Sequence, residues 1–490
     1  MSGRDRRGTI CGTLAAAALA VTFGCAVGPD FERPKPPAEA GYTEGPPLQE
    51  TILADGNRQR FVPGAELLAD WYRLFCSAEM QARIEGGLAA NPTLEAARAS
   101  LRRSEDDLRA GYGVFLPQID SGSSASRQHP FLGVTGVPRQ TFDLYTVSAT
   151  VDYVLDVFGG ERRTVESEGA QVDFQRYEAA AAYLTLVGNV LNATIAEASY
   201  AAQIDATRRL IATERDQVHI LGVQADAGTI PYAGVLVLET QLSATEAQLP
   251  VLEQRLSETQ HLLATLLGEE PAAWSSTPVS LTSLELPRDV PLTVPSELVR
   301  QRPDILAVEA QLHAASAEIG VATAALYPHL TLTGTYGWDN TSPSPLFAGP
   351  NAIWLYGAQL AAPLFHGGTL WFKRRSAIDS YQQSFATYRQ TVLAALAQVA
   401  DLLRALEHDA EQVAAQARQE KAAHEALRLT SVNYQSGVAS YLEVLISDVQ
   451  ENQAMIASIG GRAQRLQDSV ALFVALGGGW WNAKDVILQE

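Results

Sequence analysis

The stretch "LYTVSATVDYVLD" (Leu144 to Asp156) decides the fold of this 490-residue chain. Apolar and polar side chains alternate along it, and its apolar positions are Tyr145, Val147, Ala149, Val151, Tyr153 and Leu155. A period of two is typical of a β-strand with one apolar and one polar face. Most of the remaining chain has the pattern of long helices. The sequence therefore predicts two-faced strands within a mainly α-helical protein.

The motifs of the first half recur in the same order in the second half. The matching pairs are "NPTLEAA" (91–97) with "RPDILAVEA" (302–310), "LPQI" (116–119) with "YPHL" (327–330), "DVFGG" (156–160) with "LFHGG" (364–368), and "AGTIPY" (227–232) with "SGVASY" (436–441). A series of this kind indicates an internal duplication. We predict repeats at 91–268 and 303–477, with a proline-rich connector at 269–302.

Both repeats are predicted to have the same plan. A first helix (91–115; 303–326) ends before a proline, because proline disfavours helix in the preceding residue. Two strands follow, and then a very long helix (160–226; 368–434). A turn that contains Gly228 or Gly437 leads into a returning helix (232–267; 440–475).

The returning helix of the first repeat has apolar or threonine positions at alternating spacings of three and four. They are Val235, Leu238, Leu242, Thr245, Leu249, Leu252, Leu256, Thr259, Leu263 and Leu266. This spacing is the heptad seam of a coiled coil. Pro250 interrupts the seam and is expected to kink the helix or to split it in two.

The strands are about 9–12 residues long, which suits a tilted crossing of a bilayer. In the second repeat the strands are "LTLTGTYGW" (330–338) and "WLYGAQLAAP" (354–363). The predicted outer face holds Leu330, Leu332, Tyr336, Trp338, Trp354, Tyr356, Ala358 and Leu360, and the inner face holds Thr331, Thr333, Thr335, Asp339 and Gln359.

Four strands cannot close into a barrel, and an open sheet edge in hydrocarbon leaves unpaired N–H and C=O groups. We therefore expect a β-barrel that is shared among copies of the chain. Two copies would supply eight strands and a filled interior, whereas three would supply twelve strands and an open bore. The alternative is the edge of a soluble β-sandwich.

The N-terminus and the composition narrow the function. Arg4, Arg6 and Arg7 precede an apolar run, which predicts a signal peptide over 1–24. After this segment we expect no uncharged apolar run of 18 residues, and therefore no transmembrane helix. The net charge of −19, without a basic cluster, argues against nucleic acid as a partner. Cys76 is predicted to be a small buried hydrophobe.

Three segments carry a resemblance to a known family. "CAVGPDFERPKPP" (25–37), "VPSELVRQRPDILAVEAQL" (294–312) and "GVATAALYPHLTLTG" (320–334) resemble the TolC-like outer-membrane factors. Within that family the chain is most similar to the lipoprotein channels of resistance–nodulation–division efflux systems. The resemblance implies a homotrimer with a twelve-stranded outer-membrane barrel and a coiled-coil helical tunnel in the periplasm. It also implies a periplasmic adaptor and an inner-membrane pump as partners, and passive export of small molecules.

The resemblance also assigns roles to residues. Cys25 matches the lipid-modified (palmitoylated) first residue, so 25–90 is expected to hold a lipid-anchored extended segment and a first helix. The preceding Thr22-Phe23-Gly24 departs from the usual lipobox, and "ALA" (18–20) is a rival cleavage site. A C-terminal tail is expected at 478–490.

Near the helix turns, Glu443 matches an acid that, in the family, lines the closed periplasmic aperture. Asp448 and Glu239 are weaker candidates for the same role. The alternative for Glu443 is a solvated acid at a helix start. Adaptor contacts are expected at the turns, at Gly228, Tyr232, Gly437 and Tyr441.

No enzyme, metal site or cofactor is expected. "HEALR" (424–428) has Arg428 where a zinc motif needs its second histidine, and no P-loop or G-x-S-x-G elbow is present in the sequence. Two alternatives to small-molecule efflux stay open: an exit duct for secreted polypeptides, and a non-conducting coiled-coil scaffold of the cell envelope.

Overall fold

The computed structural model describes residues 26–38, 41–44, 48–129, 141–275 and 278–482. The predicted signal peptide and Cys25 lie outside the described residues, as does most of the predicted C-terminal tail. The described chain is mostly helical, as predicted, and forms two compact units. The first unit contains the segment that ends at Pro34, together with Leu101–Gln175 and Ala307–Arg389. The second contains Lys35–Ser100, Arg176–Leu306 and the segment from Gln390.

The first half of the chain contains the elements that its pattern predicts. They are α3 (Pro92–Gly111), β2 (Gln118–Gln128), β3 (Phe142–Leu155), α4 (Gly160–Asp226) and α5 (Tyr232–Leu266). A short 3-10 helix, η2 (Tyr112–Phe115), extends α3 towards Pro117. The very long helix predicted over 160–226 is therefore confirmed.

The second half repeats this order of elements. They are α7 (Pro303–Ala324), β5 (His329–Asn340), β6 (Ala352–Ala361), α8 (Thr369–Gln435) and α9 (Tyr441–Ala475). The two long helices, α4 and α8, have 67 residues each, and the two returning helices, α5 and α9, have 35 residues each. The equal lengths agree with the matching order of motifs in the sequence.

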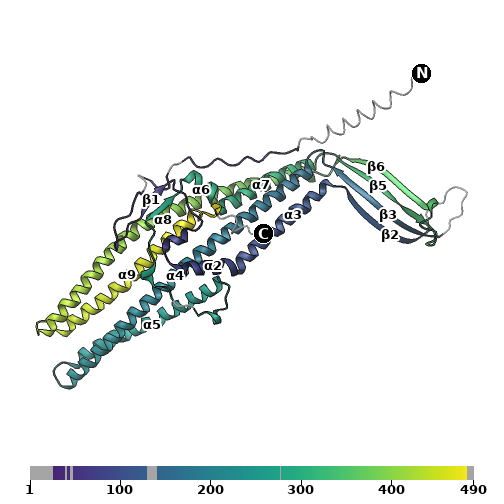
Figure 1. The fold of residues 1–490 in the computed structure, drawn as a ribbon. Coiled ribbons are helices and arrows are strands. Elements are labelled where there is room, and N and C mark those ends of the chain that lie inside the picture. Colours follow the sequence, from purple (N-terminus) through teal and green to yellow (C-terminus); the bar gives the residue numbers. More distant parts are fainter. Residues whose placement is uncertain (1–25, 39–40, 45–47, 130–140, 276–277, 483–490) are drawn as a thin grey trace. The chain divides into compact units, whose positions relative to one another are not determined.

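The four long strands form one antiparallel sheet in the order β2-β3-β5-β6, and Figure 1 shows them side by side. The two middle strands come from different halves of the chain. Among the described residues, β2 and β6 each pair with a single strand, so one edge of each has no partner strand. The structure therefore contains an open sheet of four strands.

Smaller elements lie between and before the repeats. They are β1 (Arg60–Pro63), α2 (Ala78–Ala90), β4 (Asp289–Leu292) and α6 (Pro295–Gln301). The strands β1 and β4 pair in parallel, with Arg60 opposite Asp289. This two-stranded sheet was not predicted, because its strands have four residues each and are separated by more than 200 residues of sequence.

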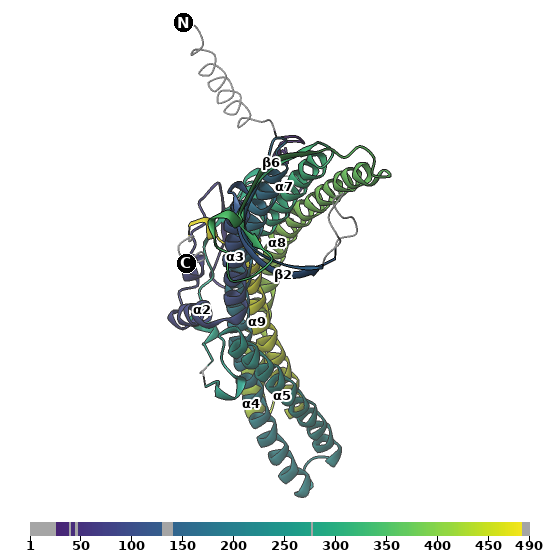
Figure 2. The ribbon, with the colours of Figure 1, turned by 90° about the vertical axis from the view of Figure 1, so that its right-hand side faces the viewer.

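The seam predicted along α5 is confirmed, because none of its ten positions is exposed. Figure 2 shows α5 lying along α4, and Thr245 of α5 donates a hydrogen bond to Glu214 of α4. Of the two outcomes expected at Pro250, splitting is excluded, since α5 continues through this proline. The second unit also has a large core, in which the Trp71 and Phe473 rings stack with centroids 5.0 Å apart.

Two predictions need correction. Cys76 is exposed and has a left-handed φ of 55° where it ends the 3-10 helix η1 (Trp71–Phe75), so the prediction of a buried cysteine is wrong. A window within α4 is long and apolar enough to cross a membrane, contrary to the expectation that no such window exists. That window is 67% buried inside the protein, as in the core helix of a soluble domain, so it is no evidence of a membrane span.

Candidate functional site: a two-faced sheet and two helix turns

The register of the sheet collects the apolar side chains of three strands on one face. Leu155 of β3 lies opposite Leu330 of β5, which lies opposite Leu360 of β6. Further along, Ala149 lies opposite Tyr336 and Tyr336 opposite Trp354. Side chains on one strand alternate between the faces, so every second residue joins this apolar face. The register therefore supports the assignment of faces made from the sequence.

The opposite face of the sheet carries hydrogen-bonded polar side chains. Thr333 Oγ1 donates to Asp152 Oδ1 at 2.7 Å, and the hydroxyls of Thr150 and Thr335 lie 3.2 Å apart. These pairs join β3 of the first half to β5 of the second half. The sheet therefore has one apolar and one polar face, an arrangement suited to a boundary between an apolar environment and water.

The edge strands and the segment after β6 expose large apolar side chains. Ile119 of β2 is 72% exposed, Tyr356 of β6 is 78% exposed, and Leu364 beyond β6 is 94% exposed. Phe365 is also largely exposed. Exposed apolar groups in such number are typical of a surface that contacts lipid or another protein.

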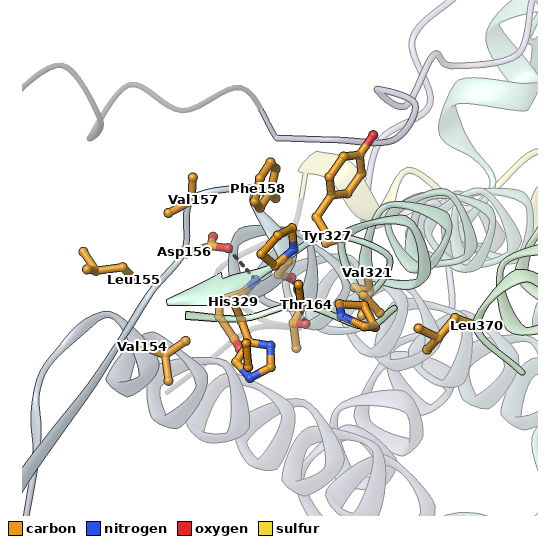
Figure 3. A pocket seen from close by; sticks show the side chains of 18 of the residues that line it. Val154, Leu155, Asp156, Val157, Phe158, Thr164, Val321, Tyr327, His329 and Leu370 are labelled. Carbon is orange, nitrogen blue, oxygen red and sulfur yellow. Dashed lines mark hydrogen bonds between the residues drawn. The ribbon is translucent and has the colours of Figure 1, made fainter. Parts of the chain in front are cut away.

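Where the sheet meets the helices, three connections surround a cavity of about 470 Å³ (Figure 3). They are the β3–α4, α7–β5 and β6–α8 connections, and the lining includes His329, Val321 and Leu370. The Phe158 and Tyr327 rings stack at 4.6 Å. Asp156 accepts hydrogen bonds from the backbone N–H groups of Glu161 and Arg162, and so stabilises the start of α4.

An N-terminal strap, defined here as residues 26–34, packs against the rest of the first unit, of which it is a part. Val27 donates its N–H to the Phe158 carbonyl at 3.0 Å, and the Phe31 ring stacks on His313 at 4.4 Å. Arg163 donates to Asp30 at 2.7 Å and to the Val27 carbonyl at 3.3 Å. The first described residues are therefore held at the junction of sheet and helices, and Cys25 directly precedes them.

The two helix turns predicted from the repeated glycines have the same backbone geometry. Gly228 donates to the Ala225 carbonyl and Thr229 to the Gln224 carbonyl. At the other turn, the Gly437 N–H donates to the Tyr434 carbonyl and the Val438 N–H donates to the Asn433 carbonyl. Both glycines have a left-handed φ, of 72° and 74°, which other residues adopt only at a cost. This pair of hydrogen bonds is a Schellman motif.

The predicted residues near the turns lie in different environments. Glu443 is exposed at the start of α9, where its N–H donates to the Ser440 hydroxyl, as expected for an acid in the first helical turn. Glu239 and Tyr232 are exposed, whereas Tyr441 is half-buried and lies 5.1 Å from the Tyr434 ring. Of the three predicted aperture acids, Glu443 and Glu239 are therefore exposed within the single chain, whereas Asp448 is buried.

Asp448 differs from the other predicted acids because it is buried, with 6% of its surface exposed. Burial raises the pKa of Asp448 to about 6, and the charges of Glu214 and Glu451 add to this increase. Glu214 of α4 is also buried, and its sequence pattern did not mark it as a candidate, because it looks like the exposed acids of the same helix. Among the described residues, no three His, Cys, Asp or Glu side chains form a group that could hold a metal ion.

Comparison with known proteins agrees with this geometry. The profile of the "Outer membrane efflux protein" family matches residues 84–269 and 294–478, which together are more than half of the chain. OpmQ of Pseudomonas aeruginosa, a pyoverdine export outer membrane protein, is 28% identical over 453 residues, covering 91% of this chain and 95% of OpmQ. TtgC of Pseudomonas putida, a toluene efflux pump outer membrane protein, is 29% identical over 475 residues, covering 95% of each chain.

Solved structures show the same fold. The outer-membrane channel OprN has a TM-score of 0.83 at 24% identity, covering 93% of this chain and all of OprN. The outer membrane protein VceC of Vibrio cholerae has a TM-score of 0.77 at 24% identity, covering 84% of this chain and 100% of VceC. Together with the two-faced sheet and the paired helical hairpins, the match in both halves establishes that the chain belongs to the outer membrane efflux protein family.

Proposed function

We propose that the protein is the outer-membrane exit duct of a tripartite efflux system. In this proposal three copies form a twelve-stranded barrel that continues into a helical tunnel in the periplasm. An adaptor protein and an inner-membrane resistance–nodulation–division pump deliver the cargo, and the duct conducts it passively. The observation that carries the proposal is the open sheet, because the internal repeat relates its free edges, on β2 and β6, to the edges of β5 and β3 that pair within the chain.

The repeat can be expressed as a shift in residue number that changes by only two residues between its first helix and its long helix. The shift from α3 to α7 is 211 residues, from Pro92 to Pro303, and the shift from α4 to α8 is 209 residues, from Gly160 to Thr369. Applied to the strands, these shifts convert the pairing of Gln118 with Asp152 into the pairing of His329 with Ala361. That second pairing is present in the sheet, so the shifts hold in the strands as well.

The same shifts predict how two copies join. Within one chain, β3 pairs with β5, and Leu155 lies opposite Leu330. The same shifts convert this pairing into a pairing of the β6 end of one copy with β2 of the next copy. Leu364 of one copy then lies opposite Ile119 of the next, and Ala358 lies opposite Ala125. Leu364 and Ile119 are strongly exposed in the single chain, and this contact covers both. The face assignment is kept across the seam, because Leu364 and Ile119 both belong to the apolar face.

A closed barrel removes the cost of the open edges. Each unpaired backbone group in hydrocarbon costs several kcal/mol, and β2 and β6 each present such groups along one side. Two copies would give eight strands, whose interior side chains fill. Three copies would give twelve strands and room for a water-filled bore. We therefore favour the trimer.

The remaining roles follow from position. Cys25, next to the strap, carries a palmitoyl anchor in the outer membrane in this proposal. The turns at Gly228 and Gly437, with Tyr232 and Tyr441, form the adaptor contact, and Glu443 faces the periplasmic aperture of the trimer. The Schellman geometry of both turns supports the adaptor contact, because it gives the two hairpins equivalent tips.

The cargo is proposed to be small molecules. The relatives are named for pyoverdine export and toluene efflux, which supports this class over secreted polypeptides. The scaffold alternative would need no bore. Single-channel recording in planar bilayers separates the two classes, because a duct gives discrete conductance steps and a scaffold gives none.

Disulfide cross-linking tests the seam directly. In a Cys76→Ser background, the double variant Leu364→Cys/Ile119→Cys should cross-link between copies, because opposite residues in a sheet have Cα atoms about 4.5–5.5 Å apart. Non-reducing gels should show dimers and trimers that disappear with dithiothreitol.

The matched control is Leu364→Cys/Gln118→Cys, in which the two side chains point to opposite faces. Monomers only, or equal cross-linking in the control, would contradict the proposed seam. Conductance steps from a protein whose seam cysteines fail to cross-link would keep the duct and reject this register.

A further inference from the structure

A groove near the helix turns is lined by α4, α5 and α9 and holds a cavity of about 570 Å³. Its lining is mixed: the apolar part includes Val237 of α5 with Leu442 and Ile446 of α9, and the polar part includes Gln241 and Gln450. About half of the surface of each of these three apolar side chains is exposed. A cavity of this volume lies within the range of roughly 300–1,000 Å³ that is typical of sites for drug-sized molecules.

The floor of the groove contains buried oxygen acceptors that have no donor. Glu214 is 1% exposed, its Oε1 accepts a hydrogen bond from Thr245 at 3.2 Å, and the Gln241 side chain also stabilises its carboxylate. Among the described residues, no group donates to Glu214 Oε2 or to the side-chain oxygen of Gln217, which is 8% exposed. Buried acceptors are normally satisfied, so each of these two oxygens suggests a missing donor or cation.

The charges around the floor are those of acids. Asp448 lies beside Glu214, and its Oδ2 also has no donor among the described contacts. The other charged groups that act on this pair are Glu246 of α5 and Glu451 of α9, and these two pair with Arg215 and His424. Glu214 and Asp448 are therefore buried acids of the groove for which the described contacts provide no ion-pair partner.

We propose that this groove binds an amphipathic organic cation. The positive centre lies against Glu214, where it satisfies the free carboxylate oxygen, and the apolar body packs on Val237, Leu442 and Ile446. Burial raises the pKa of Glu214, so its ionised form is disfavoured until a cation lies beside it, and this coupling gives the site its preference for positive charge. The site lies within one chain, so the inference goes beyond the proposed duct and does not depend on conduction.

Two probes of the same shape and opposite charge test the inference. Tetraphenylphosphonium and tetraphenylborate are titrated into the detergent-solubilised full-length protein by isothermal calorimetry. We expect the cation to bind and the anion to bind at least about tenfold more weakly, a difference of about 1.4 kcal/mol. Equal binding of the two ions would reduce the groove to an apolar surface and overturn the proposal.

Variants assign the effect to the groove. Glu214→Gln and Asp448→Asn should each weaken cation binding, the first by about tenfold or more. The matched control is Glu258→Gln, which changes an exposed acid of α5 and should leave binding unaltered. If the buried substitutions prevent folding, Ile446→Lys places a positive charge at the half-exposed rim and should abolish cation binding. Unchanged binding in Ile446→Lys would contradict the assignment.

The pH dependence gives a further readout, since neither probe titrates. Cation binding should weaken as the pH falls through about 6, where Asp448 gains its proton. The Asp448→Asn variant should lose the part of that dependence that comes from Asp448, and Glu214→Gln should lose the part that comes from Glu214, whose pKa burial also raises. Binding that is independent of pH in the wild-type protein would count against the carboxylates as the binding groups.

Discussion

Gly28 is the position at which a single methyl group should detach the N-terminal strap. Its φ is 99°, and a Cβ atom there would lie 2.5 Å from the Gly320 Cα and 3.0 Å from the Gly320 nitrogen. Both atoms belong to the backbone of α7, so no side-chain rotation relieves the contact. The substitution Gly28→Ala therefore requires the strap to move away from α7.

The expected cost can be compared with what holds the strap. A left-handed φ costs an alanine about 1–2 kcal/mol, and overpacking adds about 1–3 kcal/mol. Against this, the two hydrogen bonds of Val27 contribute about 0.5–1.5 kcal/mol each. The Phe31–His313 stacking adds about 0.5–1.5 kcal/mol. The Asp30 carboxylate is 92% exposed, so its ion pair with Arg163 adds about 0–1 kcal/mol, and the half-exposed Arg33 adds a second ion pair, with the buried Glu309 of α7. Cost and stabilisation are similar, so a large fraction of the molecules should have a detached strap.

Hydrogen–deuterium exchange of the solubilised protein measures the detachment. In the wild-type protein the Val27 amide is protected by its bond to the Phe158 carbonyl, and in Gly28→Ala this protection should fall sharply. Exchange in the buried part of α4 should stay unchanged, which shows that the rest of the chain is folded.

The control is Gly64→Ala, because Gly64 also has a left-handed φ, of 73°, but its added Cβ would have no neighbour within 4 Å. This control should leave strap exchange unchanged. If the strap amides of Gly28→Ala remain as protected as in the wild type, the reasoning about the close approach to α7 is refuted.

Three further predictions concern the second unit. Arg83→Met should lower the free energy of unfolding by about 3–5 kcal/mol, because it leaves the fully buried Glu197 without its ion-pair partner at 2.6 Å. In chemical denaturation, the double variant Arg83→Met/Glu197→Leu should recover most of this loss. Equal losses in the single and the double variant would contradict the reasoning. Burial and a hydrogen bond with Asp468 raise the pKa of Asp409 from 3.8 to about 7, so the folded protein holds a proton that the unfolded chain releases. The free energy of unfolding of the wild-type protein should therefore fall as the pH rises from about 4 to about 7. Denaturation curves of Asp409→Asn should show a smaller fall over the same range. Identical pH profiles of the wild type and the variant would exclude Asp409 as the source. Gly437→Ala should lower the stability of the turn by about 1 kcal/mol, because position 437 has a left-handed φ of 74°. The loss should be visible as faster amide exchange at the end of α8. The control Gly460→Ala, within α9, should not destabilise the protein.

The sequence by itself determined the elements and their order. The bounds of α4 and the two helix turns follow from local signals, namely helical periodicity and a glycine after the last helical turn. The two faces of the sheet follow from alternation along β3 and β5, because neighbouring side chains of a strand must point to opposite sides. These features depend on residues close together in the chain, and such signals can be read without knowing what packs against them.

Only the tertiary structure decided which side chains become buried and which remain without partners. Glu443 and Asp448 lie five residues apart on α9 and look alike in the sequence, yet the first is exposed and the second is buried. The difference arises because α9 packs against helices of the first half, which brings Glu214 close to Asp448 across more than 200 residues of chain. Burial depends on contacts between segments that are distant in sequence, and no local pattern specifies those contacts.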